Sequence, residues 1–283
     1  MSGNQDPAVQ RRRLRIILRN ARVAANKTQK QAAAELYWST SKLMRIENGA
    51  VRVTVTDLRA LLSLYGITDE GRVDELVGMA RIARYHHWTT YRDVLSPEFI
   101  AYLGYENAAA TIRSFQSLLL PGLLQTADYA RAVLRIVAGG NEPRIQRLLD
   151  ARLTRQRLLF QRENPPQMFF MLDEAVLRRK VGSCQVTAAQ LEHLVHLAAR
   201  PHVHLRVLGF EKGVHPGMNG PFAVLEFADL DDGEVIFLEG WSQMVVREGP
   251  GSDFRYRTRF AQLEAMAAPE SEFVDIVRAI RAE

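Results

Sequence analysis

One short stretch of the chain, between Tyr37 and Gly49, holds several side chains that can donate hydrogen bonds to another molecule. They are Ser39, Thr40, Ser41, Lys42 and Arg45. An arginine guanidinium group can donate two parallel hydrogen bonds to guanine, whereas a hydroxyl group accepts several kinds of partner on the base edges. Residues of these types, presented together, are suited to contact with nucleic acid.

Two short helices must position these side chains. Thr28 offers an N-cap hydroxyl group and Gln31 completes a capping box, so a helix is predicted from this point to a tight turn at residues 37–38. Ser39 caps the next helix. That helix ends at Gly49, because glycine accepts the left-handed conformation that is common at helix C-termini.

Helical periodicity predicts three further helices around this pair. The first precedes it, with apolar residues at Leu14, Ile17, Leu18, Ala21 and Ala25. Another follows it and ends at Gly66, with apolar residues at Leu58, Leu61, Leu62 and Tyr65. A fifth helix, capped by Thr68, carries Val73, Leu76 and Val77.

The positive charge of the chain is concentrated at its N-terminal end. The 283 residues have a formal net charge of +5, and residues 1–60 contain twelve Lys and Arg against four Asp and Glu. A basic segment is suited to a polyanion, either nucleic acid or an anionic membrane surface, and charge alone does not separate these two partners. Arg11 to Arg13 are either a solvated helix start or part of a DNA contact.

The composition also bounds the environment of the protein. Cys184 is the only cysteine, which excludes an intrachain disulfide and a thiolate-rich metal site, and we expect it to be a small buried hydrophobe. No stretch reaches the roughly 20 apolar residues that span a bilayer, and the N-terminus lacks the apolar run of a signal peptide. We therefore expect a cytoplasmic protein with no membrane partner.

The segment TQKQAAAELYWSTSKLMRIENG, preceded by LRNARVAANK and followed by DLRALLSLYG, resembles the phage-repressor-type helix-turn-helix family, also called the Xre family. The resemblance covers residues 11–66. It rests on the spacing of Thr28-Gln29, Ala33, Ser39, Ile46 and Glu47-Asn48-Gly49. Tyr37 departs from the pattern, because this turn position is often glycine and a positive φ would cost a tyrosine about 1 kcal/mol or more.

The resemblance implies that the helix opened by Ser39 lies in the major groove of an operator, with its first turn facing the bases. The residues that match base-reading positions are Thr40, Ser41 and Arg45, and Lys42 lies beside them. Arg45 is expected to pair with guanine, while the two hydroxyl groups are permissive readers.

Other positions of the motif have supporting roles. Gln29 and the N–H groups at the start of its helix match a site that holds a phosphate oxygen. Such a contact fixes the register of the protein on the duplex and does not read the base sequence. Arg22 and Glu47 match positions that form an ion pair in this family. Trp38 either stacks on a base or packs on the core of the small domain, and packing is the favoured interpretation.

The rest of the chain predicts an α+β domain with one small antiparallel sheet. The expected helices are residues 108–113, 126–137, 144–161, 191–199, 254–266 and 272–282, and the expected strands are QMFFML, VHLRVL, FAVLEF and EVIFLE. The predicted organisation is an all-α, five-helix helix-turn-helix domain at residues 1–80, a connecting segment at 81–95, and the α+β domain at 96–283.

A second resemblance lies in this C-terminal part. The phrases YENAAATIRSFQSLLLPGLLQTADYARAVL, RLTRQRLL, LDEAVLRRKVGS, QLEHLV and HPGMNGPFAVLEF look like the C-terminal domain, of unassigned function, of WhiJ-like regulators from sporulating filamentous bacteria. The most specific phrase is PGLLQT followed by YARA. The resemblance implies a transcription factor that often pairs with a very small protein encoded beside it, and it implies no known ligand or cofactor.

Enzyme and metal interpretations are weaker. The histidines at 193, 196, 202 and 204 have loose spacing for a metal site, and no carboxylate or cysteine accompanies them at a recognised interval. The acids 173–174 beside the arginines 178–179 read more simply as an ion-pair patch at a helix start. We therefore expect no catalytic residue, metal or cofactor. The candidate partner or ligand site is the loop with His215, Gly217 and Asn219, because long glycine-containing loops often carry function.

Two functional hypotheses follow. The first is a sequence-specific regulator that binds a double-stranded DNA operator as a homodimer, with the C-terminal domain dimerising and sensing a small protein or a ligand. The second is an antitoxin-like interaction protein that sequesters a small partner encoded nearby and autoregulates its own promoter. They differ in whether tight binding of the neighbouring gene's product is required.

Overall fold

The computed structural model describes residues 7–49, 51–82, 87–229, 233–239, 244–248 and 254–283. The chain divides into two compact units, Met1–Trp88 and Thr89–Glu283, and each is considered by itself. Part of the predicted connecting segment, residues 83–86, lies outside the described residues.

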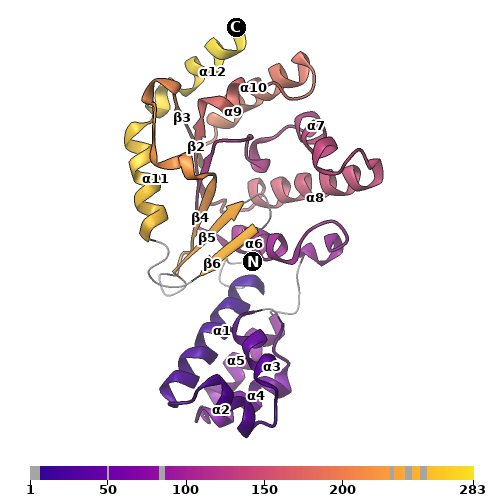
Figure 1. Cartoon of the computed structure of the whole chain (residues 1–283), viewed down its shortest axis with the longest axis vertical. Coiled ribbons are helices and arrows are strands. Elements are labelled where there is room, and N and C mark those ends of the chain that lie inside the picture. The colour runs from indigo at the N-terminus through magenta and orange to yellow at the C-terminus, as the bar shows by residue number, and fades with distance from the viewer. Residues whose placement is uncertain (1–6, 50, 83–86, 230–232, 240–243, 249–253) are drawn as a thin grey trace. The chain divides into compact units, whose positions relative to one another are not determined.

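The N-terminal unit is helical (Figure 1). Its helices are α1 (Pro7–Ala24), α2 (Gln29–Glu35), α3 (Thr40–Glu47), α4 (Val55–Leu64) and α5 (Glu70–Ile82), which confirms the five predicted helices.

Side-chain caps start the helices of this unit. The predicted capping box is present, because the Thr28 hydroxyl accepts from the Gln31 backbone N–H and the Gln31 side chain accepts from the Thr28 N–H. The Ser39 hydroxyl accepts from the Lys42 N–H at 3.2 Å, which starts α3. At α5 the prediction was wrong by one residue: the Asp69 carboxylate, and not Thr68, accepts the N3 backbone N–H at 2.8 Å. A carboxylate also complements the positive end of the helix dipole.

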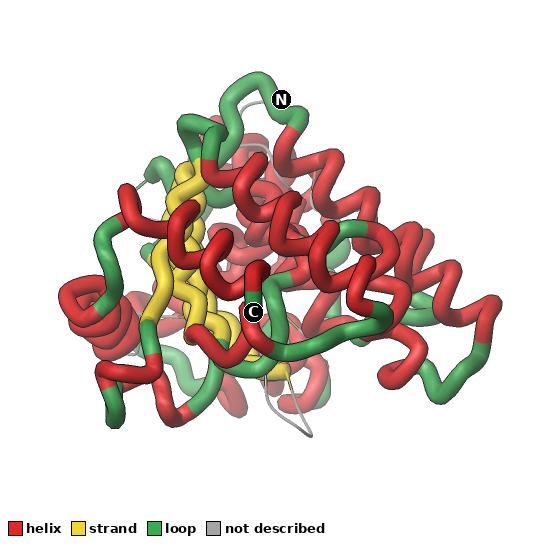
Figure 2. Tube along the Cα trace, turned by 90° about the horizontal axis from the view of Figure 1, so that it is seen from above, coloured by secondary structure: helices red, strands yellow, loops and turns green. Residues whose placement is uncertain are grey.

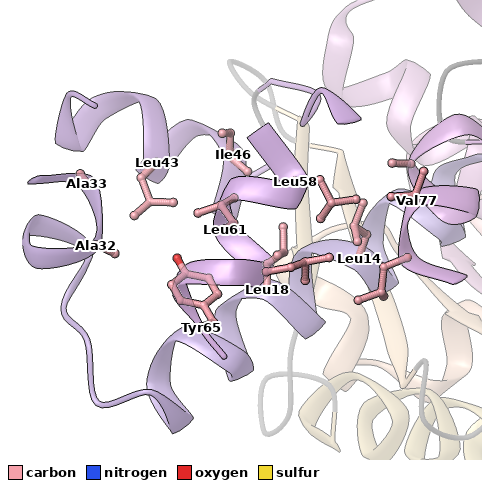
Figure 3. Packing of buried hydrophobic residues seen from close by; sticks show 13 residues of the cluster. Leu14, Leu18, Ala32, Ala33, Leu43, Ile46, Leu58, Leu61, Tyr65 and Val77 are labelled. Carbon is pink, nitrogen blue, oxygen red and sulfur yellow. The ribbon is translucent and has the colours of Figure 1, made fainter. Parts of the chain in front are cut away.

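One hydrophobic core joins all five helices (Figure 3). Leu18 of α1, Leu43 of α3 and Leu61 of α4 are each no more than 1% exposed. Ala33 of α2 is equally buried, and its small side chain allows α2 and α3 to pack closely. Trp38 is half-buried against the same core, which confirms the packing interpretation.

The C-terminal unit combines helices with one sheet (Figure 1). Its α-helices are α6 (Pro97–Ala108), α7 (Ala127–Val137), α8 (Glu142–Phe160), α9 (Glu174–Arg178), α10 (Cys184–Ala198), α11 (Phe254–Met266) and α12 (Phe273–Ala282). The 3-10 turns are η2 (His87–Tyr91), which begins before the unit boundary, η3 (Gly122–Leu124), η4 (Phe210–Lys212), η5 (Pro216–Asn219) and η7 (Glu270–Glu272). The strands are β1 (Thr111–Gln116), β2 (Gln167–Asp173), β3 (Val203–Leu208), β4 (Phe222–Glu226), β5 (Glu234–Glu239) and β6 (Met244–Glu248).

The six strands form a mixed sheet in the order β3-β2-β1-β4-β5-β6. Figure 2 shows the strands of this sheet in yellow. The α+β class is confirmed, and the antiparallel prediction is confirmed for the pairs β1–β4, β4–β5 and β5–β6. It was wrong for β1–β2 and β2–β3, which pair in parallel. Helices lie between these strands in the chain, as α7 and α8 do between β1 and β2, and such a crossover returns the chain in the same direction.

α11 covers one face of the sheet with Phe260 and Leu263, which pack on Phe115, Val224 and neighbouring apolar residues. The predicted helix at residues 108–113 was wrong, because α6 ends at Ala108 and β1 starts at Thr111. Strand pairing on both sides of β1 outweighs the local helical pattern. Cys184 was also misjudged: it is the exposed first residue of α10, directly after the Ser183 cap.

Candidate nucleic-acid interface

The turn between α2 and α3 is a Schellman motif. The Trp38 N–H donates to the Ala33 carbonyl at 2.8 Å and the Tyr37 N–H donates to the Ala34 carbonyl at 3.0 Å. This pattern requires a left-handed residue after the helix, and Tyr37 has φ +56°. The positive φ foreseen at this position is therefore present, at a cost of about 1 kcal/mol or more.

The solvent face of α3 carries the side chains that can reach another molecule. Leu43 and Ile46 point into the core, whereas Ser41, Met44 and Arg45 are exposed. Ser39 and Thr40 precede them in the chain, the first as the cap and the second half-buried. The structure thus presents a hydroxyl group, a thioether and a guanidinium group on consecutive turns of one short helix.

Met44 was not among the predicted contact residues, although it is 43% exposed in the middle of this polar face. Its position four residues after Thr40 and three after Ser41 would have identified it from helical spacing alone.

Lys42 is engaged inside the unit. Its ammonium Nζ lies 2.7 Å from Asp57 Oδ1 and 3.7 Å from the centroid of the Trp38 ring. Asp57 belongs to α4, so this contact ties α3 to α4 and neutralises the Lys42 charge. The geometry therefore gives Lys42 a role in positioning α3, in addition to the DNA contact that the sequence motif predicted.

A buried ion pair fixes the orientation of α3. Arg22 Nε and Nη2 donate to the two oxygens of Glu47 at 2.7 and 3.0 Å, and the two side chains are 11% and 2% exposed. The Gln29 amide donates to the same carboxylate at 2.7 Å. Glu47 therefore links α1, α2 and the end of α3 at one point.

The contact with Glu47 keeps the Arg22 guanidinium charged. The hydrogen bond to Glu47 raises the pKa of Arg22 above its usual value, so the guanidinium does not lose its proton. Burial, reinforced by the nearby Glu47 carboxylate, raises the pKa of Tyr65 to about 12. Tyr65 therefore remains neutral beside the pair at all ordinary pH values.

Arg11 lies on α1, apart from α2 and α3 in the chain. With Arg15 and Arg52 it lines a small hollow of about 20 Å³ beside Gly49, at the end of α3. Arg15 donates to the Asn48 carbonyl at 3.1 Å, and a Cβ at Gly49 would lie 2.3 Å from the Arg15 guanidinium. Arg11 and Arg15 of α1 thus lie at the C-terminus of α3, where the helix dipole is negative.

The loop singled out in the C-terminal unit is packed onto the sheet. His215 is 8% exposed, its Nδ1 accepts from the Gly217 N–H, and its Nε2 lies 3.3 Å from Asp173 Oδ2. A Cβ at Gly217 would lie 2.4 Å from the Phe115 ring, so glycine is required there. Asn219 is exposed. Two of the three residues therefore anchor the loop, and only Asn219 faces solvent.

The sequence did not indicate a cavity of about 310 Å³ beside the sheet. Phe169 and Met171 of β2, His204 and Arg206 of β3 and Glu264 of α11 line it. Its size is at the lower end of the roughly 300–1,000 Å³ that small-molecule sites occupy. Arg206 is held by two backbone carbonyls at 2.9 Å each, so its guanidinium group has a fixed direction.

Several of the side chains considered for catalysis or metal binding are held by other residues. His204 lies 3.1 Å from Glu270, and Asp173 caps α9. Glu174 forms an ion pair with Arg178, which confirms the expected patch at a helix start. Within the described ranges, no group of three or more His, Cys, Asp or Glu is arranged to hold a metal ion.

The phrase PGLLQT, the most specific part of the second resemblance, is held by buried glutamines. Gln125 donates to the Leu120 carbonyl at 2.7 Å. Gln190 of α10 accepts from the Thr126 N–H and donates to the Leu124 carbonyl, both at 2.7 Å. These amides satisfy the backbone groups of a loop that would otherwise bury unpaired polar atoms.

Comparison with known families agrees with this division of the chain. Residues 13–76 match a helix-turn-helix domain, and residues 99–279 match a domain of unknown function, DUF5753. No curated protein and no solved structure matches the chain. Among the described helices, none has both the length and the apolar character that crossing a membrane requires. The chain therefore belongs to the DUF5753 family and carries a helix-turn-helix domain, of the kind found in DNA-binding regulators, ahead of that family's domain.

Proposed function

We propose that the protein is a cytoplasmic, sequence-specific transcriptional regulator of the Xre type, and not an enzyme, that inserts α3 into the major groove of an operator. The observation that carries this proposal is the exposed row Ser41, Met44 and Arg45 on α3. The helix is held rigidly behind that row by the Glu47 cluster. A helix presented in this way can read base edges, because the major groove distinguishes all four base pairs.

Within this interface, Arg45 pairs with guanine and the hydroxyl groups of Thr40 and Ser41 adapt to their base neighbours. The Gln29 side chain is occupied by Glu47, so the phosphate contact at the start of α2 falls to backbone N–H groups. Such contacts hold the protein in register on the duplex.

The C-terminal unit supplies dimerisation and signal reception. A single helix-turn-helix unit reads about half an operator, so specificity requires two copies on one DNA face. The resemblance to WhiJ-like regulators supports a small protein encoded nearby as one signal. The cavity lined by Arg206 and Glu264 supports a small molecule as the other.

Footprinting of the region upstream of the gene tests the proposal, with the full-length wild type, Arg45→Ala and a matched control, Arg72→Ala. Arg72 is an arginine of α5 that pairs with Glu75. Its replacement by alanine removes the same charge as Arg45→Ala does, but at a position outside α3. We expect protection by the wild type and the control. Arg45→Ala should lose about 1–3 kcal/mol on the protected site and little on scrambled DNA.

Absence of a protected site there, together with no motif selected from random duplexes, would contradict the proposal, as would equal losses for both variants. Repeating the footprint with the adjacent small protein separates the regulator from the antitoxin-like alternative. The alternative requires tight binding of that protein and rescue of growth, and the regulator requires neither.

A further inference from the structure

Four helix ends in the N-terminal unit have a residue in the left-handed region. They are Asn26, Tyr37, Gly49 and Gly66, with φ between +54° and +78°. Glycine and asparagine adopt this conformation at little cost, whereas a side chain such as tyrosine does so under strain. Tyr37 is therefore the exception among these four positions.

Contacts within the chain do not explain the exception. Tyr37 is 98% exposed, and its neighbour Trp38 makes the hydrophobic contact that accompanies a Schellman motif. Within the described residues, the Tyr37 ring and hydroxyl take part in no hydrogen bond or ring contact. The Schellman hydrogen bonds and Trp38 hold the turn, but they do not require a tyrosine side chain at this position. A strained residue with an exposed ring is typical of a residue used in binding.

The position of Tyr37 identifies the partner. It lies two residues before Ser39, the cap of α3, so it sits beside the end of the helix that enters the groove. Because it is in the turn and not on α3, a helix docked in the groove would bring it near the strand backbone and not the base edges. Tyrosine hydroxyls are among the side-chain groups that bond to phosphate oxygens in protein–DNA complexes.

We propose that Tyr37 contacts the sugar–phosphate backbone of DNA, with its hydroxyl donating to a phosphate oxygen and its ring lying on the adjacent deoxyribose. This inference rests on the proposed function. It adds a contact that is neutral and independent of sequence, in contrast to the base contact of Arg45.

The test uses the full-length protein, with Tyr37→Gly, Tyr37→Phe and the control Asn26→Gly. Asn26 ends α1 at φ +54°, so the control places a glycine at another left-handed helix end. We expect Tyr37→Gly to raise the melting temperature, because the strain is relieved, and to weaken DNA binding about tenfold. The loss of affinity should be equal on operator and scrambled duplexes, and the dependence of affinity on salt concentration should not change. Tyr37→Phe should show part of the loss of affinity.

Asn26→Gly should bind DNA as the wild type does. Wild-type affinity of Tyr37→Gly or Tyr37→Phe would overturn the inference while leaving the proposed function intact. A melting temperature of Tyr37→Gly that falls further than that of Asn26→Gly would also overturn it, because the difference would reveal a stabilising contact of the tyrosine within the fold. So would a change in the sedimentation of DNA-free Tyr37→Gly, which would assign the ring to a protein contact. A wild type that binds no DNA would instead reject the proposed function itself.

Discussion

Replacing Glu47 by glutamine removes the charge that joins α1, α2 and α3 while keeping the shape of the side chain. The carboxylate accepts three hydrogen bonds, two from Arg22 and one from Gln29, at 2.7–3.0 Å. A glutamine offers one acceptor oxygen and places an N–H group against a donor. The Glu47→Gln variant therefore leaves a charge and several donors without adequate partners.

The cost follows from burial. Removing one partner of a buried ion pair destabilises a protein by about 3–5 kcal/mol. Arg22 is still 11% exposed and keeps a hydrogen bond to the Lys27 carbonyl, which reduces the loss. We expect about 2–4 kcal/mol, a large part of the roughly 4–12 kcal/mol that stabilises a unit of some 80 residues.

Urea unfolding of residues 1–88 measures this loss, because this segment contains the whole N-terminal unit. Glu35→Gln is the matched control: Glu35 also pairs with a cation, Lys27, but is 47% exposed, and its loss should be below about 1 kcal/mol. The double variant Arg22→Met with Glu47→Gln should be less destabilised than the sum of the single variants. A loss no larger than that of Glu35→Gln, or strict additivity, would refute the reasoning.

Three further predictions concern recognition, assembly and pH. Met44 lies where it can contact a thymine methyl group, which uracil lacks. Replacing single thymines of the operator by uracil should therefore weaken wild-type binding at one position per half-site and leave the binding of Met44→Ala unchanged there. Equal uracil sensitivity of both proteins would count against this contact. The full chain should sediment as a dimer, whereas residues 1–88 should be mostly monomeric and bind the operator far more weakly; a full chain that is monomeric both free and on DNA would contradict the dimer. Burial lowers the pKa of His193 and His202, so the histidines take up protons in the unfolded state at a higher pH than in the folded state. The unfolding free energy of the C-terminal unit should therefore fall as the pH drops below about 6.5. Urea midpoints that do not change between about pH 7.5 and 5.5 would exclude this effect.

Local signals in the sequence predicted the helical unit well. Capping residues such as Thr28 and Ser39 act within one turn, so their hydrogen bonds can be read from spacing alone. The exposed face of α3 likewise follows from helical periodicity. The same reasoning could not see that Lys42 meets Asp57, because that contact depends on how α4 packs against α3.

The C-terminal unit was less predictable for the same reason. The predicted helix at residues 108–113 includes the first half of β1, which becomes a strand through its pairing with β2 and β4. Parallel pairing joins segments far apart in the chain, and local pattern does not encode it. The cavity at Arg206 is also formed by elements that are distant in the chain, β2, β3 and α11, so no sequence motif predicted it.

The central claim is that α3 reads DNA sequence through the face that carries Arg45. Selection of duplexes from a random pool by the full-length wild type, Arg45→Ala and Arg72→Ala tests it most directly. We predict that the wild type and Arg72→Ala enrich the same motif, and that Arg45→Ala loses the preference for one guanine in each half-site. Enrichment of no motif by the wild type, or of an unchanged motif by Arg45→Ala, would contradict the claim.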